Sequence, residues 1–404
     1  MEETERERLY QDLPNVSKSA IKTYKYFCSF LWWKNDIVKE KEEEENALGI
    51  RTDVGTDAHL IFAGFWKKFD VEYLYKNINI NPVADLNTNP VTQYFYSICM
   101  ELTPSYDREV TVLKRIFWKF SRLHSARFLY LYNLFNGNKN KVYEYFVPKE
   151  VEQFYVVPKY GIYGTIDVVF KDIDESLIET LYIPDMKTGN VPASVLRGPT
   201  NLSDETSVKL PTKFMFETHF YGLLWLLAHG WDLHCKEINS IGGDIIMQGF
   251  ILNNIWIDDT GQWHDFGLGE TKEEQKEIDD NKKRYLTKIK PVVRRFNYQT
   301  QEWETTQDLS PIVGIIFLTG DPNVEHPVVV KKKFGATSLK TAVTRVNEIK
   351  VVYKNRFNTK YYLIREMQTR PAYDQYKCPN CSRNQKCLKE IEENFKRTGN
   401  MDEL

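Results

Sequence analysis

The stretch "YIPDMKTGN" (residues 182–190) places an acid and a lysine two positions apart at the end of a short apolar run. Side chains of an extended strand alternate between its faces, so Ile183, Asp185 and Lys187 are expected to project to the same side. A strand end that reaches solvent with a weak surface ion pair would show the same pattern. The neighbouring sequence has to decide between a surface pair and a functional site.

The preceding stretch "YGIYGTIDVVF" (residues 160–170) also alternates and predicts the partner strand of a hairpin. Two antiparallel strands of this length can bring Asp167 opposite Asp185. Two such carboxylates repel each other unless a cation lies between them, and oxygen-rich sites suit Mg²⁺ or Mn²⁺. Lys187 is then expected to face the attacking water or the scissile phosphate of a substrate.

Composition predicts a soluble globular protein with a large core and more than one subdomain. The chain has 404 residues, 42% of them hydrophobic, and a formal net charge of -2. Residues 1–9 are charged and lack an apolar signal core, and the most apolar helix candidate, residues 221–228, is too short to cross a bilayer. We therefore expect a cytoplasmic (intracellular) protein without a membrane partner. A net charge near zero gives no overall attraction to nucleic acid, so a binding surface needs uneven charge.

Three segments carry helix signals that bear on the site. Residues 17–33 ("SKSAIKTYKYFCSFLWW") predict a helix capped by Ser17, and residues 55–69 a second helix with His59 in its first turns. Residues 212–230 predict a helix that stops at Gly230. Glu217 and Tyr221 are four residues apart and lie on one face of that helix.

The segment 108–135 predicts a long helix in which cations alternate with aromatic residues. Such a helix could bind phosphates and stack its rings on unpaired bases, which favours single-stranded DNA. An amphipathic helix with its rings packed inward and its cations solvated is the other interpretation. The cations are Arg115, Lys119, Arg122 and Arg127, and the rings are Phe117, Trp118, Phe120 and Phe128.

The six cysteines fall into two groups. Cys99 and Cys235 lie in apolar stretches typical of small buried thiols. The other four, one near the start of the chain and three near its end, are Cys28, Cys378, Cys381 and Cys387. Four thiolates satisfy a [4Fe-4S] cluster and equally a tetrahedral Zn²⁺.

"GTID" followed by "DMKTG" resembles the active-site core of the PD-(D/E)xK nuclease superfamily, particularly its RecB-like branch. The order of the motifs agrees with that branch. "GTDAH" resembles the segment that carries its upstream helical histidine. Glu217 with Tyr221 resembles its Gln-x-x-x-Tyr motif, with Glu in place of Gln. One early and three late cysteines resemble the iron–sulfur members, which include AddB, the CRISPR-associated RecB-like nucleases and exonuclease V. These motifs are short but span residues 28–387.

The resemblance implies a role for each matching residue. His59, Asp167, Asp185 and the backbone carbonyl of Met186 would hold Mg²⁺ or Mn²⁺. Lys187 would orient or help deprotonate the attacking water, and Tyr221 with Glu217 would support the site. It also favours a [4Fe-4S] cluster over zinc at the four cysteines. The implied function is a metal-dependent deoxyribonuclease, expected to be an exonuclease that prefers single-stranded DNA ends, in DNA repair, recombination or CRISPR adaptation.

The implied fold is an α/β restriction-endonuclease-like core, with a mixed central sheet flanked by helices. We expect N-terminal helices with the first cluster cysteine and the motif histidine in residues 1–69 and a helical, DNA-binding insertion in 70–150. The nuclease core is expected in 151–370 and a C-terminal cysteine module in 371–404. No P-loop pattern occurs, so a helicase or a CRISPR adaptation protein would be a separate partner. The alternative function is a non-catalytic adaptor that binds DNA ends and retains the nuclease fold.

Overall fold

The structure is a computed structural model of the chain. The structure describes residues 16–22, 49–105, 107, 110–173, 178–196, 210–236, 255–257, 263–265, 271, 273–274, 276–277, 280, 290–305 and 311–354.

A mixed six-stranded sheet forms the centre of the described fold. Its strands are β1 (Val16–Ser17), β2 (Glu150–Val157), β3 (Ile162–Ile173), β4 (Glu179–Lys187), β10 (Ile312–Phe317) and β11 (Val328–Lys333). β2 and β4 pair with β3 in antiparallel fashion, whereas β1 pairs with it in parallel. β10 lies parallel to β4 and antiparallel to β11. The chain is therefore an α/β protein with a mixed sheet, as the sequence predicts.

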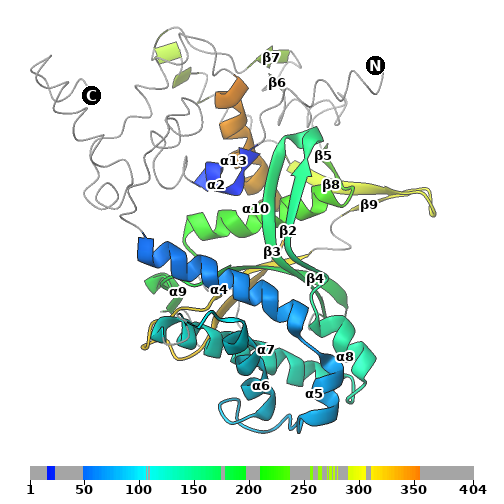
Figure 1. Ribbon diagram of the computed structural model, residues 1–404. Coiled ribbons are helices and arrows are strands. Elements are labelled where there is room, and N and C mark those ends of the chain that lie inside the picture. The colour runs from blue at the N-terminus through cyan, green and yellow to red at the C-terminus, as the bar shows by residue number, and fades with distance from the viewer. Residues whose placement is uncertain are drawn as a thin grey trace, which may run out of the picture.

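Helices cover both faces of this sheet (Figure 1). One face is covered by α10 (Thr212–Ala228) and α13 (Ala336–Lys354), with the short α2 (Lys18–Lys22) beside them. The other face carries α4 (Gly49–Lys68), α5 (Val71–Asn77), α6 (Pro90–Leu102), α7 (Thr111–Leu134) and α8 (Lys139–Phe146). Single turns follow β2 and β4, namely η3 (Pro158–Tyr160) and α9 (Ala193–Leu196).

Two apolar cores hold these layers together. On the α10 side, Phe216, Phe220 and Leu224 of the helix belong to one cluster with Ile166 and Ile183 of the sheet. On the other side, helices α4 to α8 share an aromatic core with the sheet residues Val168, Phe170, Tyr182 and Met186. Burial of this much apolar surface fixes the helix–sheet geometry, because each buried ring removes a large area from water. The helical segment expected at 70–150 thus forms part of this second layer.

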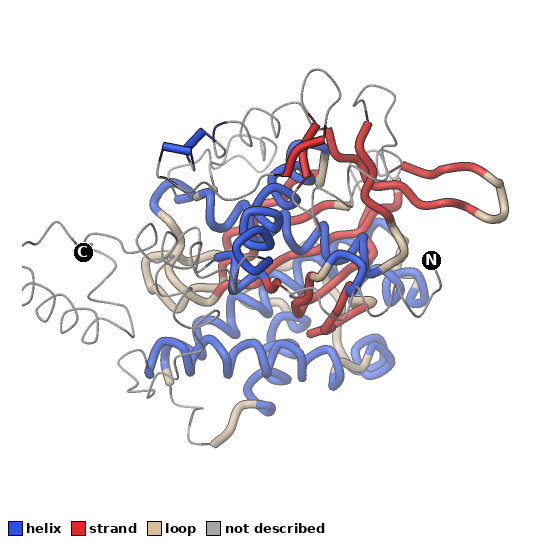
Figure 2. Tube along the Cα trace, turned by 90° about the horizontal axis from the view of Figure 1, so that it is seen from above, coloured by secondary structure: helices blue, strands red, loops and turns tan. Residues whose placement is uncertain are grey.

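Smaller sheets lie outside the central one. β5 (Asp232–Lys236), β8 (Lys290–Asn297) and β9 (Glu302–Thr305) form a three-stranded sheet, and β6 (Ile255–Ile257) pairs with β7 (Trp263–Asp265). The β8–β9 hairpin extends away from the body of the molecule in both views (Figures 1 and 2).

The predicted helix cap at Ser17 and the predicted helix end at Gly230 agree with these elements. Ser17 caps α2, because its Oγ accepts a hydrogen bond from the Ala20 N–H at 3.1 Å. Gly230 follows α10 with a φ of 80°, the conformation that ends a helix. The prediction for His59 was wrong in one respect: α4 begins at Gly49, so His59 lies near the middle of the helix and not in its first turns. None of the helices that the structure describes has both the length and the apolar character of a membrane span.

Candidate active site

Three carboxylates lie in a row across strands β2, β3 and β4. On one side of β3, Val151 pairs with Val168 and Gln153 with Ile166, which places Glu152 directly opposite Asp167. On the other side, β4 pairs with β3 only from Phe170 opposite Tyr182 onward. Continuing that register by three residues brings Asp185 opposite Asp167, as the hairpin predicts.

The strands β3 and β4 separate at the point where the acids meet. No ladder pairing is formed between the two strands at Asp167, and its side chain binds β4 instead: the Met186 N–H donates to Asp167 Oδ2 at 2.8 Å. The resemblance implies the carbonyl of Met186 as a metal ligand, whereas the contact seen here uses its N–H. This opening leaves room for side chains to converge, and it fixes the orientation of the Asp167 carboxylate.

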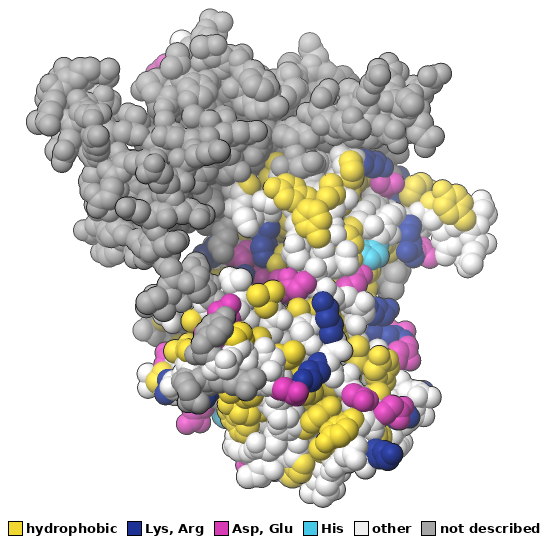
Figure 3. All heavy atoms as spheres, viewed as in Figure 1, with side chains coloured by type: hydrophobic (Ala, Val, Ile, Leu, Met, Phe, Trp, Pro, Cys, Tyr) yellow, Lys and Arg dark blue, Asp and Glu magenta, His cyan; other side chains and the backbone are white. Residues whose placement is uncertain are grey.

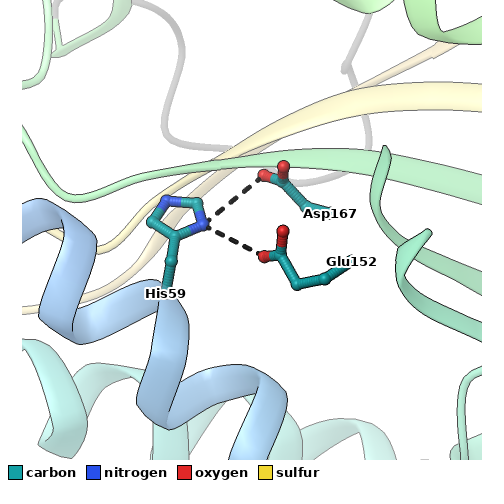
Figure 4. A group of neighbouring side chains, drawn as sticks. All are labelled: His59, Glu152 and Asp167. Carbon is teal, nitrogen blue, oxygen red and sulfur yellow. Dashed lines mark ion pairs between the residues drawn. The ribbon is translucent and has the colours of Figure 1, made fainter. Parts of the chain in front are cut away.

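His59 reaches this row of acids from helix α4 (Figure 4). Its Nδ1 lies 3.6 Å from Glu152 Oε1 and 3.9 Å from Asp167 Oδ2. One potential ligand atom from each of His59, Glu152 and Asp167 lies within 4.8 Å of the others. An imidazole nitrogen and two carboxylate oxygens at such separations match the donor set that Mn²⁺ accepts, and Mg²⁺ with less preference for the nitrogen.

The backbone of Glu152 adopts an unusual conformation. Its φ is 47°, in the left-handed region that non-glycine residues rarely occupy, although the pairing register on either side is unbroken. Two carboxylates directly opposite each other on neighbouring strands also repel. The backbone conformation of Glu152 and its repulsion from Asp167 are therefore both unfavourable, and the packing of the surrounding sheet has to offset them.

Two lysines neutralise the other end of the row. Lys187 Nζ lies 2.7 Å from Asp185 Oδ2 and 2.7 Å from Glu217 Oε2, so it bridges strand β4 and helix α10. Lys18 Nζ, from the first residue of α2, lies 3.5 Å from Asp185 Oδ1 and 3.9 Å from Glu217 Oε2. Asp185 and Glu217 are almost fully buried, with side-chain exposures of 1% and 0%. Buried acids of this kind require the cations beside them.

Tyr221 links the lysines to the row of acids. Its hydroxyl donates to Asp167 Oδ1 at 3.1 Å and accepts a hydrogen bond from Lys18 Nζ. Glu217 and Tyr221 are four residues apart on α10, and both face the site as their spacing predicts. Asp167 is thus held by Tyr221 on one oxygen and by the Met186 N–H on the other.

The pKa values of the two central acids, Asp167 and Asp185, are shifted in opposite directions. Burial and the neighbouring Asp185 raise the pKa of Asp167. Burial acts in the same direction on Asp185, but the ammonium groups of Lys18 and Lys187 lower its pKa below the usual range. Burial opposes a charged Lys187, yet Asp185 and Glu217 raise its pKa. Among the described residues, the two lysines therefore compensate Asp185 more fully than Asp167.

The pKa values of His59 and Tyr221 also respond to the neighbouring carboxylates. Burial lowers the pKa of His59, but Glu152 and Asp167 outweigh it and the pKa is raised. Burial and Asp167 raise the pKa of Tyr221, which keeps the phenol protonated and able to donate. Among the described residues, two lysines lie beside the four carboxylates of Glu152, Asp167, Asp185 and Glu217, so the acids of the site outnumber its lysines by two. A divalent cation beside His59 would balance that charge.

Figure 3 shows acidic and basic side chains across the middle of this face of the molecule. Helix α4 crosses the same region in Figure 1. The His59 and Glu152 side chains retain exposures of 29% and 37%, so solvent reaches this end of the site.

The structure brings together all the residues predicted for the catalytic and metal groups. His59, Asp167, Asp185, Met186, Lys187, Glu217 and Tyr221 contact one another directly or through one neighbour. Two further residues, Glu152 and Lys18, were missed. The alternation of residues 150–157 could have indicated that Glu152 faces the hairpin, but the sequence carries no local signal for Lys18.

Helix α7 does not present its rings to a ligand, and that part of the prediction was wrong. Phe117, Phe120 and Phe128 are fully buried in the aromatic core because they form the inward face of an amphipathic helix. Trp118 is partly buried and packs edge-on against Tyr96 at 5.3 Å.

The cations of α7 bind protein groups. Lys119 is buried and donates to the carbonyl groups of Thr319 and Asp321. Arg127 pairs with Asp172 at 3.1 Å and also donates to two carbonyl oxygens. Arg115 and Arg122 approach the carbonyl oxygens of Gly320 and Glu325 at 3.4 Å. Lys119 and Arg127 therefore hold a loop and a strand in this structure, whereas the contacts of Arg115 and Arg122 are long.

The four predicted cluster ligands, Cys28, Cys378, Cys381 and Cys387, lie outside the described residues. Cys99 is a buried free thiol in α6, and burial raises its pKa. It is the small buried residue that its apolar surroundings predict.

No protein-family model, no curated protein and no solved structure matches this chain. The candidate active site is consequently defined by its own geometry: two lysines, a histidine and four carboxylates gathered from strands β2, β3 and β4 and helices α2, α4 and α10.

Proposed function

We propose that the chain is a divalent-cation-dependent deoxyribonuclease that hydrolyses phosphodiester bonds. The observation that supports this proposal most is the acid row Glu152–Asp167–Asp185, in which Asp167 and Asp185 are buried, with His59 at one end and Lys187 at the other. A cation site and a positive group beside the reacting phosphate both stabilise the charge that develops during phosphodiester hydrolysis. The resemblance to RecB-like nucleases selects DNA among possible substrates.

The residues present fit a divalent cation. His59, Asp167 and Glu152 would hold it, with Asp185 as the neighbouring carboxylate that could share it from the other side of Asp167. When bound, such a cation polarises the phosphate and lowers the pKa of a bound water. Because one ligand is an imidazole nitrogen, we expect Mn²⁺ to support activity better than Mg²⁺.

Lys187 is the positive group of the site. Burial opposes its charge, but Asp185 and Glu217 raise its pKa, which favours the charged form and a role as a hydrogen-bond donor. Held by Asp185 and Glu217 at 2.7 Å each, its ammonium is fixed in position before substrate binds. A preorganised donor of this kind stabilises negative charge that develops on the transferred phosphate.

Tyr221 and Glu217 complete the arrangement from helix α10. Tyr221 orients Asp167 by its hydroxyl, and Glu217 orients Lys187. Outer partners like these tune the ligands they hold. Glu217 stands where the family pattern has Gln; here its charge is matched by the two lysines beside it.

Cleavage assays with end-labelled DNA test this proposal. Purified protein is incubated with single-stranded and duplex substrates in Mn²⁺, Mg²⁺ or EDTA, and the products are resolved by length. We expect cleavage with Mn²⁺, weaker cleavage with Mg²⁺ and none with EDTA, with single-stranded ends preferred. Tight DNA-end binding without cleavage under every condition would overturn the proposal and favour the adaptor alternative.

A further inference from the structure

The N-terminal segment reaches the candidate active site from the edge of the central sheet. β1 adds two residues in parallel to β3, with Val16 opposite Ile162 and Ser17 opposite Tyr163. The Val16 N–H donates to the Gly161 carbonyl at 2.9 Å. Because Ser17 then caps α2, the backbone of Lys18 is fixed on both sides.

Lys18 directs its ammonium group at three groups of the site. Nζ donates to the Tyr221 hydroxyl, lies 4.0 Å from the centre of the Tyr221 ring, and lies 3.5 Å from Asp185 Oδ1. The Lys18 side chain is 18% exposed, which is low for a lysine. Lys187 contacts the same acids, but no contact of Lys187 with Tyr221 is seen among the described residues.

The direction of the hydrogen bonds follows from the chemistry of the groups. An ammonium can only donate, so the Tyr221 oxygen must accept from Lys18. The single phenolic proton is then available for Asp167 Oδ1. Asp167 Oδ2 receives the Met186 N–H and faces His59, so the whole carboxylate is oriented by this chain of contacts.

We propose that Lys18 is a positioning residue of the active site, which fixes the Tyr221–Asp167 hydrogen bond and thereby holds Asp167 ready for a divalent cation. This inference rests on the proposed cation-dependent function. It assigns the N-terminal segment to the active site, although Lys18 lies 149 positions before Asp167 in the sequence. Lys18 acts through Tyr221 and need not touch the substrate.

A double-mutant cycle tests this inference. Lys18→Met keeps the length of the side chain and removes its charge, and Tyr221→Phe removes the hydroxyl. Mn²⁺ affinity is measured by calorimetry without DNA, and kcat is measured separately by cleavage. We expect each single variant to lose about 10-fold in Mn²⁺ affinity or in kcat, as for other outer-shell partners of a metal ligand. In the Tyr221→Phe background, Lys18→Met should add less than about twofold, because the group it acts through is gone.

Two matched variants separate positioning from general stability. Lys159→Met removes a lysine that pairs with Asp232 on the surface, and it should leave Mn²⁺ affinity unchanged. Lys18→Arg retains a donor-only cation and should recover most of the loss, even if Lys18→Met folds poorly. Circular dichroism and thermal unfolding report the folding of every variant.

Three outcomes would overturn the inference: full additivity of the two single variants, unchanged Mn²⁺ affinity and kcat in a folded Lys18→Met protein, or no Mn²⁺ binding by the wild-type chain. A different outcome separates the two proposals: the wild-type protein binds Mn²⁺ but cleaves no DNA, and the two variants show coupled losses of Mn²⁺ affinity. That outcome would support the role of Lys18 and refute the nuclease proposal. The failure of one proposal is therefore distinguishable from the failure of the other.

Discussion

Asp167 and Asp185 lie opposite each other three residues beyond the last paired position of strands β3 and β4, where Phe170 faces Tyr182. The two acids occupy the opening between the strands, and their environments differ. Asp185 is compensated by two lysines, whereas Asp167 is held by neutral donors and by a histidine. This asymmetry places the need for a cation at Asp167.

The compensated acid should be indispensable for cleavage. We expect Asp185→Asn to lower the cleavage rate by about 100-fold or more, because the Lys187 ammonium and the cation site lose a shared carboxylate. The matched control is Asp172→Asn, since Asp172 is a buried acid of the same sheet that pairs with Arg127 and Lys331. Both variants should lower the melting temperature, but only Asp185→Asn should abolish cleavage. Equal activity of the two variants would disprove the role of Asp185.

Glu152 should separate metal binding from stability. Glu152→Gln is expected to weaken Mn²⁺ binding by about 10-fold, because the substitution removes one charged ligand from the set that Glu152 forms with His59 and Asp167. Because the φ of Glu152 is 47°, Glu152→Gly should be more stable than Glu152→Ala by about 1 kcal/mol. Calorimetry with Mn²⁺ and urea unfolding measure the two effects. An alanine variant as stable as the glycine variant would contradict the assigned backbone conformation.

Lys119 should contribute to stability and not to DNA binding. Its ammonium is buried and donates to the carbonyl oxygens of Thr319 and Asp321. Lys119→Met leaves these carbonyl groups without a donor, which should cost on the order of 1–3 kcal/mol. The salt dependence of single-strand binding should stay the same, whereas loss of a phosphate contact would reduce its slope by roughly 0.7. A reduced slope in a normally stable variant would restore the DNA-binding interpretation of α7.

The pair of His229 and Glu150 should give a pH-dependent contribution to stability. Burial lowers the pKa of His229, but the hydrogen bond with Glu150, 3.1 Å away, raises it above 6.5 overall. Burial raises the pKa of Glu150, but His229 and Tyr155 outweigh it and lower it below 4.5. The His229 contribution is present below pH 6.5 and is lost as the pH rises through the raised pKa. The Glu150 contribution is present above pH 4.5 and is lost at lower pH.

Melting temperatures of wild type and His229→Gln measure this effect between pH 5 and 9. The difference should be largest at roughly pH 5 to 6 and should shrink toward pH 9. The difference should correspond to at most about 1 kcal/mol in the free energy of unfolding, because the pair is partly exposed. A difference that is constant with pH would show that His229 stabilises only by stacking on Trp225, 4.0 Å away.

The cysteine prediction can be tested without structural information on the cluster. We expect anaerobically purified wild type to contain iron and labile sulfide, and Cys28→Ser or Cys378→Ser to be colourless and sensitive to protease. Cys99→Ala is the control, since Cys99 is buried in α6 and should keep the chromophore. Stoichiometric zinc without iron would refute the iron–sulfur assignment and leave a structural zinc site.

The sequence predicts the parts of the site that depend on local periodicity. Alternation along β4 places Asp185 and Lys187 on one face, and the spacing of Glu217 and Tyr221 places both on one face of α10. These residues meet because the helix packs its apolar face on that side of the sheet. Local periodicity, together with the packing of α10 on the sheet, is therefore sufficient to predict that these four residues lie in the site.

The rest depends on contacts between distant segments. Lys18 enters the site through a parallel pairing of only two residues, which no alternation reveals. Glu152 faces Asp167 in an unbroken register, but its φ is set by the folded sheet. Three of the four cations of α7, Arg115, Lys119 and Arg122, find carbonyl partners about 200 positions later in the chain, so a helix with alternating charge and rings resembles a binding surface when read alone.

The parallel pairing of β4 with β10 has a consequence for protein synthesis. β4 ends at Lys187, and its partner β10 begins at Ile312, so the ribosome must add more than a hundred residues before the two strands can meet. During that time the strand that carries Asp185 and Lys187 presents a free hydrogen-bonding edge, which is the usual starting point of misassociation. Nascent chains that stall before residue 312 should therefore be inactive and require chaperone protection.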